Sequence, residues 1–492
     1  MSSINTMASP SFPTLPIDHQ GRGGKRIFDG KPSYTTDQAA GVLTRSGKRW
    51  HDINNDGRTD ITYQFQTAPG PLFSLYKFGG FSEFGDAQKT AARDAMASWA
   101  DVANLRFTQG STVGSAEGNV GFGNFSPKED GELVIAEATG LPTESTQRFL
   151  AQNPRIPRTV LTSDVYFDGH DEANTAPSLT NGRLKSYVHE VGHALGLSHP
   201  HDDDGTTTYA EDSLGYSVMS YRDELYTGQD FTKNGSKHYA RGPMVDDIAA
   251  AQKIYGANTN ARKGDTTYGF NSNADREDFR LKHSSDAPVF TIWDSAGVDT
   301  MDFSGFHHSQ LINMSPGKAS SVGGMKGNVF IAKGATIENA VGGTGDDVFI
   351  SNRAQNAMTG NGGNNTYRFL NAKQSRPGQA DRITDFVSGK DKIDVSQMHL
   401  KSEKASGTQA AVQGSQTAGR KPKGKKLQRP VELASQFSAK RNEAVLSYDQ
   451  HAKQARLEID TNGNGKPNFL LLIDSDKALK PTDIIVSKPL AI

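Results

Sequence analysis

Apolar residues recur at helical spacing in three stretches of the first half of the chain. In residues 86–102 they lie three or four positions apart, which is the pattern of one buried helix face. The positions are Ala92, Met96, Trp99 and Val102. We interpret this helix as a core-packing element without chemistry of its own. Two further helices are expected over about 183–195 and 244–255.

Short runs of β-type residues lie between these helices, separated by turns rich in Gly and Pro. The predicted strands are residues 119–125, 132–135 and 164–168. Beyond Gly256 the pattern changes to short β-branched and aromatic segments cut by Gly, Asn and Asp, with no long helical pattern. The fold class is therefore predicted to be α+β: a domain with a mixed sheet and long helices, followed by an all-β domain.

A period of nine residues appears inside the all-β part, over residues 342–368. Its first unit, GGTGDDVFI, matches the G-G-x-G-x-D-x-U-x repeat of a calcium-binding parallel β-roll. The second unit is degenerate, and the third has Asn361 in place of a glycine and Asn365 in place of the aspartate. We predict a short parallel β-roll, and a Gly-rich hairpin is the alternative.

Two polar segments are expected to lie outside the folded domains. Residues 1–27 are rich in Ser, Pro and Gly and lack the apolar stretch of a secretory signal peptide, so we predict a disordered leader or propeptide. Residues 401–430 are of low complexity and are predicted to form a flexible insertion. The insertion ends in a basic cluster at 420–429, for which binding to an anionic surface or polysaccharide is an open alternative to simple solvation.

Composition narrows the possible chemistry. The formal net charge of the 492 residues is -1, which argues against nucleic acid as a partner. The chain has no cysteine, so any metal must be held by histidine or by oxygen atoms. We found no run of about 18 apolar residues, and a transmembrane segment is not expected.

The stretch H-E-V-G-H-A-L-G-L-S-H predicts a catalytic zinc site. His189 and His193 are four residues apart on one helix face and can bind the same ion. Gly196 can take a left-handed conformation that ends the helix and turns His199 back as third ligand. Glu190 is poorly directed for ligation but can reach a water at the metal, which is the position of a general base.

Two alternatives to an active peptidase remain. The first is a non-catalytic binding module that kept the fold, which would be indicated by loss of the base or of a ligand. Neither is lost in this sequence. The second is a zinc hydrolase that acts on another type of bond, which digestion of a protein substrate with and without chelator would distinguish.

This motif resembles that of the metzincin clan of metalloproteases. The sequence outside the motif resembles one metzincin family, the serralysins. The matching stretches include GKPSYTTDQAA, ALGLSHP, TYAEDSLGYSVMSY, DDIAAAQKIYGAN and GNVFIAKGATIENAVGG. The resemblance implies that Met219 forms an apolar floor beneath the three histidines, as a Met-turn. It also implies that Tyr221 lies beside the metal, as a possible additional zinc ligand and as a stabiliser of the oxyanion.

The resemblance implies a secreted, monomeric zinc endopeptidase that acts on proteins or peptides outside the cell. It further implies export by an ABC-type (type I) secretion system without an N-terminal signal peptide. Residues 483–486 match the C-terminal export signal of the family, but the added SKPLAI departs from it. The expected domains are the leader 1–27, the catalytic domain 28–256, the RTX-like β-roll domain 257–400, the insertion 401–430 and a C-terminal β segment 431–492.

The resemblance also implies several structural calcium ions. The first set of ligands would be Arg262, Gly264, Thr266, Asp294, Ala296 and Asp299. The second would be Gly297, Asp299, Thr336 and Glu338. The third, in the β-roll, would be Gly343, Gly345, Asp347, Gly360, Gly362 and Asn365. The third set is the weakest because Asn365 offers a neutral amide where the family has a carboxylate.

Two other stretches, at residues 52–60 and 460–465, have the Asp/Asn spacing with which a calcium-binding loop begins. Neither ends in the bidentate glutamate that such a loop needs. We interpret both as tight hairpin turns.

Overall fold

The computed structural model describes residues 21–52, 54–69, 79–110, 119–126, 135–137, 163–178, 181–202, 204–398 and 431–486. Residues 1–20 of the expected leader, the insertion 401–430 and the SKPLAI tail lie outside the described residues. The chain divides into two compact units, one of Met1–Gln310 with Met314–Ile337, the other of Leu311–Asn313 with Glu338–Ile492. Within the described residues, we find no helix that is long and apolar enough to cross a membrane.

The first unit is built on a mixed sheet with the strand order β5-β3-β6-β8-β7, in which β4 also pairs with β6. Strands β3, β5, β6 and β8 are parallel, and β4 and β7 are antiparallel to their partners. Their bounds are β3 (Thr59–Phe65), β4 (Gly79–Ser82), β5 (Leu105–Gln109), β6 (Asn119–Ser126), β7 (Ile135–Glu137) and β8 (Ser163–Asp168). The strands predicted at 119–125 and 164–168 are confirmed. The strand predicted at 132–135 falls almost entirely outside the described residues.

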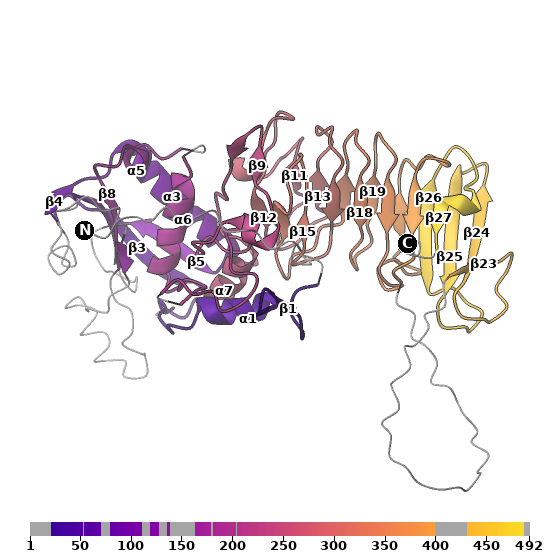
Figure 1. Ribbon diagram of the computed structural model, residues 1–492, viewed down its shortest axis with the longest axis horizontal. Helices are drawn as coiled ribbons and strands as arrows, with labels where there is room; N and C mark the ends of the chain where they lie inside the picture. Colours follow the sequence, from indigo (N-terminus) through magenta and orange to yellow (C-terminus); the bar gives the residue numbers. More distant parts are fainter. Residues whose placement is uncertain are drawn as a thin grey trace, which may run out of the picture. The chain divides into compact units, whose positions relative to one another are not determined.

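The helices of this unit are α1 (Thr36–Leu43), α3 (Asp86–Val102), α5 (Glu172–Thr175), α6 (Arg183–Ala194) and α7 (Val245–Tyr255). The three predicted helices are therefore confirmed, as α3, α6 and α7. In Figure 1, α3 and α6 lie side by side. The predicted apolar face of α3 is buried, and the indole of Trp99 donates a hydrogen bond to the carbonyl of Val188 in α6, 3.0 Å away. The core-packing helix thereby supports the helix that carries the zinc motif.

The remaining elements of the first unit are short. They are β1 (Ile27–Phe28), β2 (Lys31–Pro32), β9 (Thr232–Lys233), β10 (Ser236–Lys237), β11 (Thr267–Gly269), β12 (Phe290–Ile292), β13 (Thr300–Asp302), β15 (Ala319–Ser320), β16 (Val329–Ile331), η1 (Glu224–Thr227) and η2 (Glu277–Phe279). Strands β11 and β13 are parallel, as are β12 and β16.

The second unit begins as a parallel β-roll. One face has the order β14-β18-β20-β22-β27, and the other runs β17-β19-β21-β26 before continuing into β25, β24 and β23. The stacked strands appear as successive arrows from orange to yellow in Figure 1. Their bounds are β14 (Leu311–Asn313), β17 (Asn339–Val341), β18 (Val348–Ile350), β19 (Ala357–Thr359), β20 (Thr366–Arg368), β21 (Asp381–Ile383), β22 (Lys392–Asp394), β23 (Glu432–Leu433), β24 (Glu443–Asp449), β25 (Gln454–Asp460), β26 (Phe469–Asp474), η3 (Pro481–Asp483) and β27 (Ile484–Ile485).

The roll follows the predicted period. Val348 pairs with Thr366 in parallel register, eighteen residues or two nonapeptides later. Phe349 and Tyr367 lie one above the other inside the roll, fully buried, with their rings stacked 5.1 Å apart. The parallel roll is confirmed, and the Gly-rich hairpin alternative is excluded for residues 348–368.

The two loops interpreted as hairpin turns differ. Residues 461–468 join β25 to β26, which are antiparallel, so this loop is a hairpin connection. The loop at residues 52–58 leads into β3, whose partners β5 and β6 are both parallel to it. The hairpin interpretation is wrong there, because β3 lies in the parallel part of the sheet. Asp52 instead accepts hydrogen bonds from the backbone of Asp56 and Gly57, 3.2 and 2.8 Å away.

Candidate metal centre

Three histidines meet at the C-terminal end of α6. The Nε2 atoms of His189 and His193 are 3.1 Å apart, those of His193 and His199 2.9 Å, and those of His199 and His189 3.3 Å. Among the described residues, this is the group of His, Asp or Glu side chains with the spacing of a metal site. The structure therefore brings the three predicted ligands together.

The protonation of the first two rings follows from their second nitrogens. Nδ1 of His189 lies 2.8 Å from the carbonyl oxygen of Val218, and Nδ1 of His193 lies 2.8 Å from that of Leu197. Because a carbonyl oxygen can only accept a hydrogen bond, each Nδ1 carries the ring proton and donates the hydrogen bond. The Nε2 atom of each ring then has a free lone pair.

Burial favours the neutral form of all three rings. It lowers the pKa of His193 to about 4 and that of His199 to about 3, and it holds the pKa of His189 well below its ordinary value. The proximity of His193 lowers the values of the other two further. Neutral imidazoles whose lone pairs converge repel one another unless a cation lies between them. Three nitrogens about 2.0–2.1 Å from a tetrahedral zinc ion lie about 3.3 Å from one another, so the cluster fits zinc.

The turn after α6 places the third histidine. Gly196 has φ +90, and a Cβ atom there would lie 2.2 Å from the carbonyl oxygen of Lys48. Only glycine fits this close approach without a shift of the backbone. Arg45 then donates to the backbone carbonyls of both His199 and His201, the second at 2.9 Å. The chain is thereby held on both sides of the third ligand.

Met219, expected from the resemblance to form an apolar floor beneath the histidines, packs against α6 at Gly192. Its side chain is fully buried, and a Cβ atom added to Gly192 would lie 2.6 Å from its sulfur. Asp247 holds the backbone of this turn: its carboxylate accepts from the hydroxyl of Ser217 at 2.5 Å and from the amide of Val218 at 2.7 Å. Burial raises the pKa of Asp247 to about 7, against the effect of these hydrogen bonds.

Glu190 and Tyr221 are the remaining residues of the predicted centre. Glu190 is buried, and this burial raises its pKa to about 8, while the charge of Lys185 opposes the rise. The ring of Tyr221 lies 4.4 Å from that of His199 and 5.6 Å from that of His189, yet it is 68% exposed. Burial, followed by the charge of Glu190, raises its pKa. A phenol beside the cluster and open to solvent can contact a ligand that enters from outside.

Sequence reasoning missed several groups around the centre. His201 is buried and stacks on His199 with the ring centroids 4.8 Å apart and the planes 9° apart. Its ring also lies 4.8 Å from that of Tyr221, and Arg45 and Asp247 likewise contact residues in other parts of the chain, so no local motif marks these groups.

The first predicted calcium set gathers oxygen atoms in the first unit. Asp294 and Asp299 are both buried, and their carboxylates accept from the hydroxyl of Tyr268 at 2.6 Å and from the amide of Thr266 at 2.8 Å, respectively. A Cβ atom on Gly297 would lie 2.7 Å from the carbonyl oxygen of Gly264 and 2.8 Å from Oδ1 of Asp299. Two adjacent buried carboxylates require a proton or a cation, so this cradle of oxygens fits calcium. The second set, Gly297, Asp299, Thr336 and Glu338, draws on both units and stays a prediction.

The predicted calcium site in the roll is arranged differently. Oδ1 of Asn365 accepts a hydrogen bond from the amide of Asp347 at 3.0 Å, which fixes the orientation of the side-chain amide. Nδ2 therefore points toward Gly362 and donates to its carbonyl oxygen at 2.9 Å. Nδ2 of Asn361 donates to the carbonyl oxygen of Gly342 at 2.7 Å. Calcium binds only oxygen, and one of the expected ligands, Gly362, already accepts from an amide. Asn361 and Asn365 thus form an amide network in these turns, and the calcium site of the roll stays a prediction.

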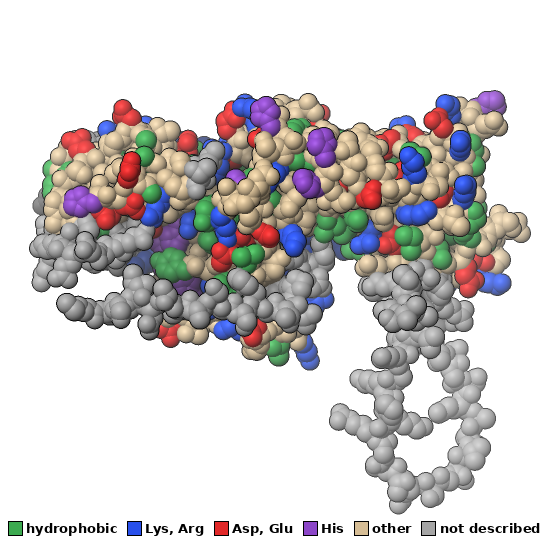
Figure 2. Space-filling view, turned by 45° about the horizontal axis from the view of Figure 1, so that its top comes forward, with side chains coloured by type: hydrophobic (Ala, Val, Ile, Leu, Met, Phe, Trp, Pro, Cys, Tyr) green, Lys and Arg blue, Asp and Glu red, His purple; other side chains and the backbone are tan. Residues whose placement is uncertain are grey.

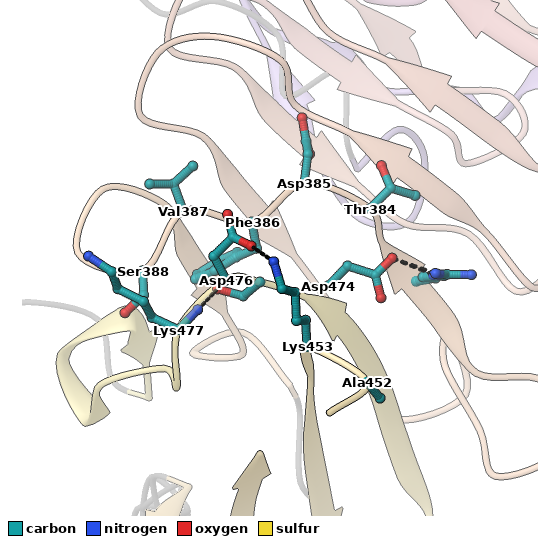
Figure 3. A pocket seen from close by; sticks show the side chains of 12 residues that line it. Thr384, Asp385, Phe386, Val387, Ser388, Ala452, Lys453, Asp474, Asp476 and Lys477 are labelled. Atoms are coloured by element: carbon teal, nitrogen blue, oxygen red, sulfur yellow. Dashed lines mark hydrogen bonds and ion pairs between the residues drawn. The ribbon is translucent and has the colours of Figure 1, made fainter. Parts of the chain in front are cut away.

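The second unit has a hollow of about 630 Å³, and its lining residues, between positions 382 and 477, are far from the histidines in the sequence. As Figure 3 shows, Lys453 points toward Asp476, at 2.8 Å, and a second pair joins Arg382 to Asp474 at 2.6 Å. Asp385, which also lines the hollow, accepts from the backbone amides of Gly360 and Asn361 at 2.9 and 2.7 Å. On the face in Figure 2, acidic and basic side chains are interspersed, in agreement with the net charge of -1.

Comparison with known proteins gave consistent results for both parts of the chain. The family model described as Matrixin matches residues 77–216, and the model described as Peptidase M10 serralysin C terminal matches residues 257–419. The chain is 41% identical to a protein named Metalloprotease AprA from Pseudomonas entomophila, with 94% of this chain and 93% of that protein covered.

Two further relatives carry the name serralysin. Serralysin from Photorhabdus laumondii is 39% identical over 77% of this chain and 80% of that protein. Serralysin C from Dickeya chrysanthemi is 34% identical over 93% of this chain and 91% of that protein. The solution structure of the AlgE6R3 subunit of the Azotobacter vinelandii mannuronan C5-epimerase covers 39% of this chain and 82% of its own, at 17% identity and a TM-score of 0.23, which is too low to support a fold assignment.

Proposed function

The chain belongs to the serralysin family of zinc metalloproteases and is a metalloendopeptidase, and from this premise we propose that His189, His193 and His199 hold the catalytic zinc while Glu190 acts as general base. The convergence of the three Nε2 atoms within 2.9–3.3 Å of one another carries this proposal. A zinc ion bound there would polarise the scissile carbonyl and lower the pKa of a water molecule.

The protein groups divide the work of hydrolysis. The carboxylate of Glu190 takes a proton from the water as its oxygen attacks the peptide carbon, and it later gives this proton to the leaving amine as the C–N bond breaks. The phenol of Tyr221 donates a hydrogen bond to the oxyanion that develops on the substrate. The carbonyls of Val218 and Leu197 fix the orientation of two imidazoles. The exposure of Tyr221 supports a site open to a polypeptide substrate.

The finer features implied by the resemblance are also proposals. We propose that the enzyme acts outside the cell as a monomer on proteins or peptides, after export by a type I system without an N-terminal signal peptide. We further propose that structural calcium binds at Asp294 and Asp299, where the paired buried carboxylates support a cation.

The test is the substitution Glu190→Gln, which removes the proton acceptor and leaves all three imidazoles in place. We expect one zinc per chain, an unchanged circular dichroism spectrum, and a turnover of a protein substrate lowered by about 10²–10⁴-fold. Glu172→Gln is the matched control, on the exposed first turn of α5, with unchanged turnover. Retention of more than a tenth of the wild-type turnover in Glu190→Gln would refute the assignment of the base.

A further inference from the structure

Arg22 is buried, and its ion-pair partner follows it by 224 positions. Its side chain is 3% exposed, and its two terminal nitrogens lie 2.8 Å from the two carboxylate oxygens of Asp246, near the start of α7. Nε donates to the carbonyl oxygen of Tyr34 at 3.1 Å. The guanidinium group also lies over the ring of Tyr216, 4.4 Å from its centroid. Packing thus begins before residue 28, where the sequence led us to expect the start of the fold.

The groups that Arg22 contacts lie next to the catalytic turn. The amide of Asp246 donates to the carbonyl oxygen of Tyr216 at 3.0 Å. Arg22 therefore contacts two residues, Asp246 and Tyr216, that are also hydrogen-bonded to each other. Tyr216 is followed directly by Ser217 and Val218, the two residues held by Asp247. The carbonyl of Val218 in turn accepts from Nδ1 of His189. A short series of contacts therefore leads from Arg22 to a zinc ligand.

Electrostatics explains why a cation is required at this place. Asp246 and Asp247 are consecutive and both fully buried, and the buried carboxylate of Glu211 also faces Arg22. The N-terminus of α7 stabilises part of the negative charge, but two adjacent carboxylates without solvent repel each other. Arg22 forms a bidentate ion pair with Asp246, the strongest geometry available to a guanidinium group. Loss of one partner would leave an uncompensated buried charge beside the turn.

We propose that Arg22 is a positioning residue of the peptidase. By neutralising Asp246 it lets Asp247 keep its hold on residues 217 and 218, and this keeps the imidazole of His189 oriented for ligation. The mature enzyme must then retain residue 22, so N-terminal processing can remove only residues that precede it. The inference rests on the zinc site proposed above.

The experiment is a double-mutant cycle with zinc affinity as the main readout. We expect Arg22→Ala to weaken zinc binding by about 10–100-fold, as for other groups that orient a metal ligand. Turnover should fall more than KM rises, and the visible spectrum of the cobalt-substituted protein should change. Adding Asp246→Asn to Arg22→Ala removes the unpaired charge and should recover most of the zinc affinity. Lys333→Ala, which breaks an exposed ion pair with Asp37, is the control and should change none of these.

Two truncations test the processing limit. A chain that lacks residues 1–20 should match the full chain in zinc affinity, and a chain that lacks residues 1–24 should match Arg22→Ala. Unchanged zinc affinity and turnover in folded Arg22→Ala would overturn the proposal, and so would a double variant no better than the single one. If the single variant fails to fold, the double variant decides, since the proposal requires it to fold and to keep most of the wild-type zinc affinity. Failure of the zinc site itself would appear separately, as a wild-type protein that binds no zinc.

Discussion

The histidine cluster and the β-roll turns at 342–347 and 360–365 were both predicted to bind metal, but their donor atoms are engaged in opposite ways. In the cluster, protein carbonyls take up the Nδ1 hydrogens of His189 and His193, and the Nε2 lone pairs are left facing one another. In the roll, Nδ2 of Asn365 donates a hydrogen bond to the carbonyl oxygen of Gly362, so a hydrogen atom faces that oxygen. The first arrangement calls for a cation, whereas in the second the carbonyl of Gly362 already accepts a hydrogen bond from the Asn365 amide.

The comparison teaches that ligand-type residues at the right spacing do not by themselves make a metal site. The deciding quantity is whether hydrogens or lone pairs occupy the centre of the cluster. A carboxylate at position 365 would place a second oxygen near the carbonyl of Gly362, and these oxygens would attract calcium. The amide closes the same turn by hydrogen bonding, so this part of the roll can stack without the ion.

The largest expected effect separates the two regions directly. His193→Ala removes a zinc ligand and should lower turnover by more than about 10³-fold, because the several kcal/mol of metal stabilisation are lost. Asn365→Ala removes the amide of the roll and should leave turnover within about twofold. Both are measured with one protein substrate at saturating zinc. Equal losses in the two variants would mean that the roll supports catalysis and that the contrast is wrong.

The next effect tests how rigidly the cluster is preorganised. Gly196→Ala brings a Cβ atom into contact with the carbonyl oxygen of Lys48 at a positive φ, so we expect His199 to shift and zinc affinity to fall by at least about tenfold. Gly205→Ala is the matched control, with φ +80 and open space around its Cβ position. Titration of both apoproteins with zinc measures the difference. Identical affinities would show that the close approach at Gly196 is not what places His199.

A gain of calcium dependence is expected in the roll. Asn365→Asp replaces the donor to Gly362 by an oxygen, and without calcium it should destabilise the second unit by about 1–3 kcal/mol. Calcium should reverse this loss in the variant and have little effect on the same turn of the wild type. Urea unfolding, followed by tyrosine fluorescence with and without calcium, measures the free energy of unfolding of the second unit. Asn464→Asp, on an exposed loop of the same unit, is the control. A wild-type roll turn already stabilised by calcium would contradict the amide interpretation.

The smallest effect concerns pH. The buried carboxyl of Asp381 accepts from Ser351 and Asn356, and its burial raises its pKa to about 7 from 3.8. Because the folded value lies above the unfolded one, the stabilisation is complete below pH 3.8 and is lost as pH rises toward about 7. Asp381→Asn should therefore flatten the fall of unfolding free energy across this range. Parallel curves for variant and wild type would show that Asp381 ionises normally.

The sequence alone was sufficient to predict the position of a site residue where the motif is local. The four-residue spacing of His189 and His193 determines that both lie on one helix face, and Gly196 marks the end of that helix. Arg22 lay inside a segment that composition described as a leader, and its partner Asp246 is 224 positions away. For Asn365, the residue type indicated a weaker calcium site, but not which of its two amide atoms faces Gly362. That choice follows from the amide of Asp347 in the preceding turn, which only the stacked register reveals.

Hydrogen exchange during staged metal removal tests the central contrast most directly. Wild-type protein is first depleted of calcium and then of zinc, and exchange is followed at the amides of Asp347, Asn365 and Thr366 and at residues 197–221. We predict that calcium removal leaves the three roll amides protected, and that zinc removal abolishes activity and raises exchange around His199 and Met219. Loss of protection at the roll amides on calcium removal, or full activity without zinc, would contradict the account.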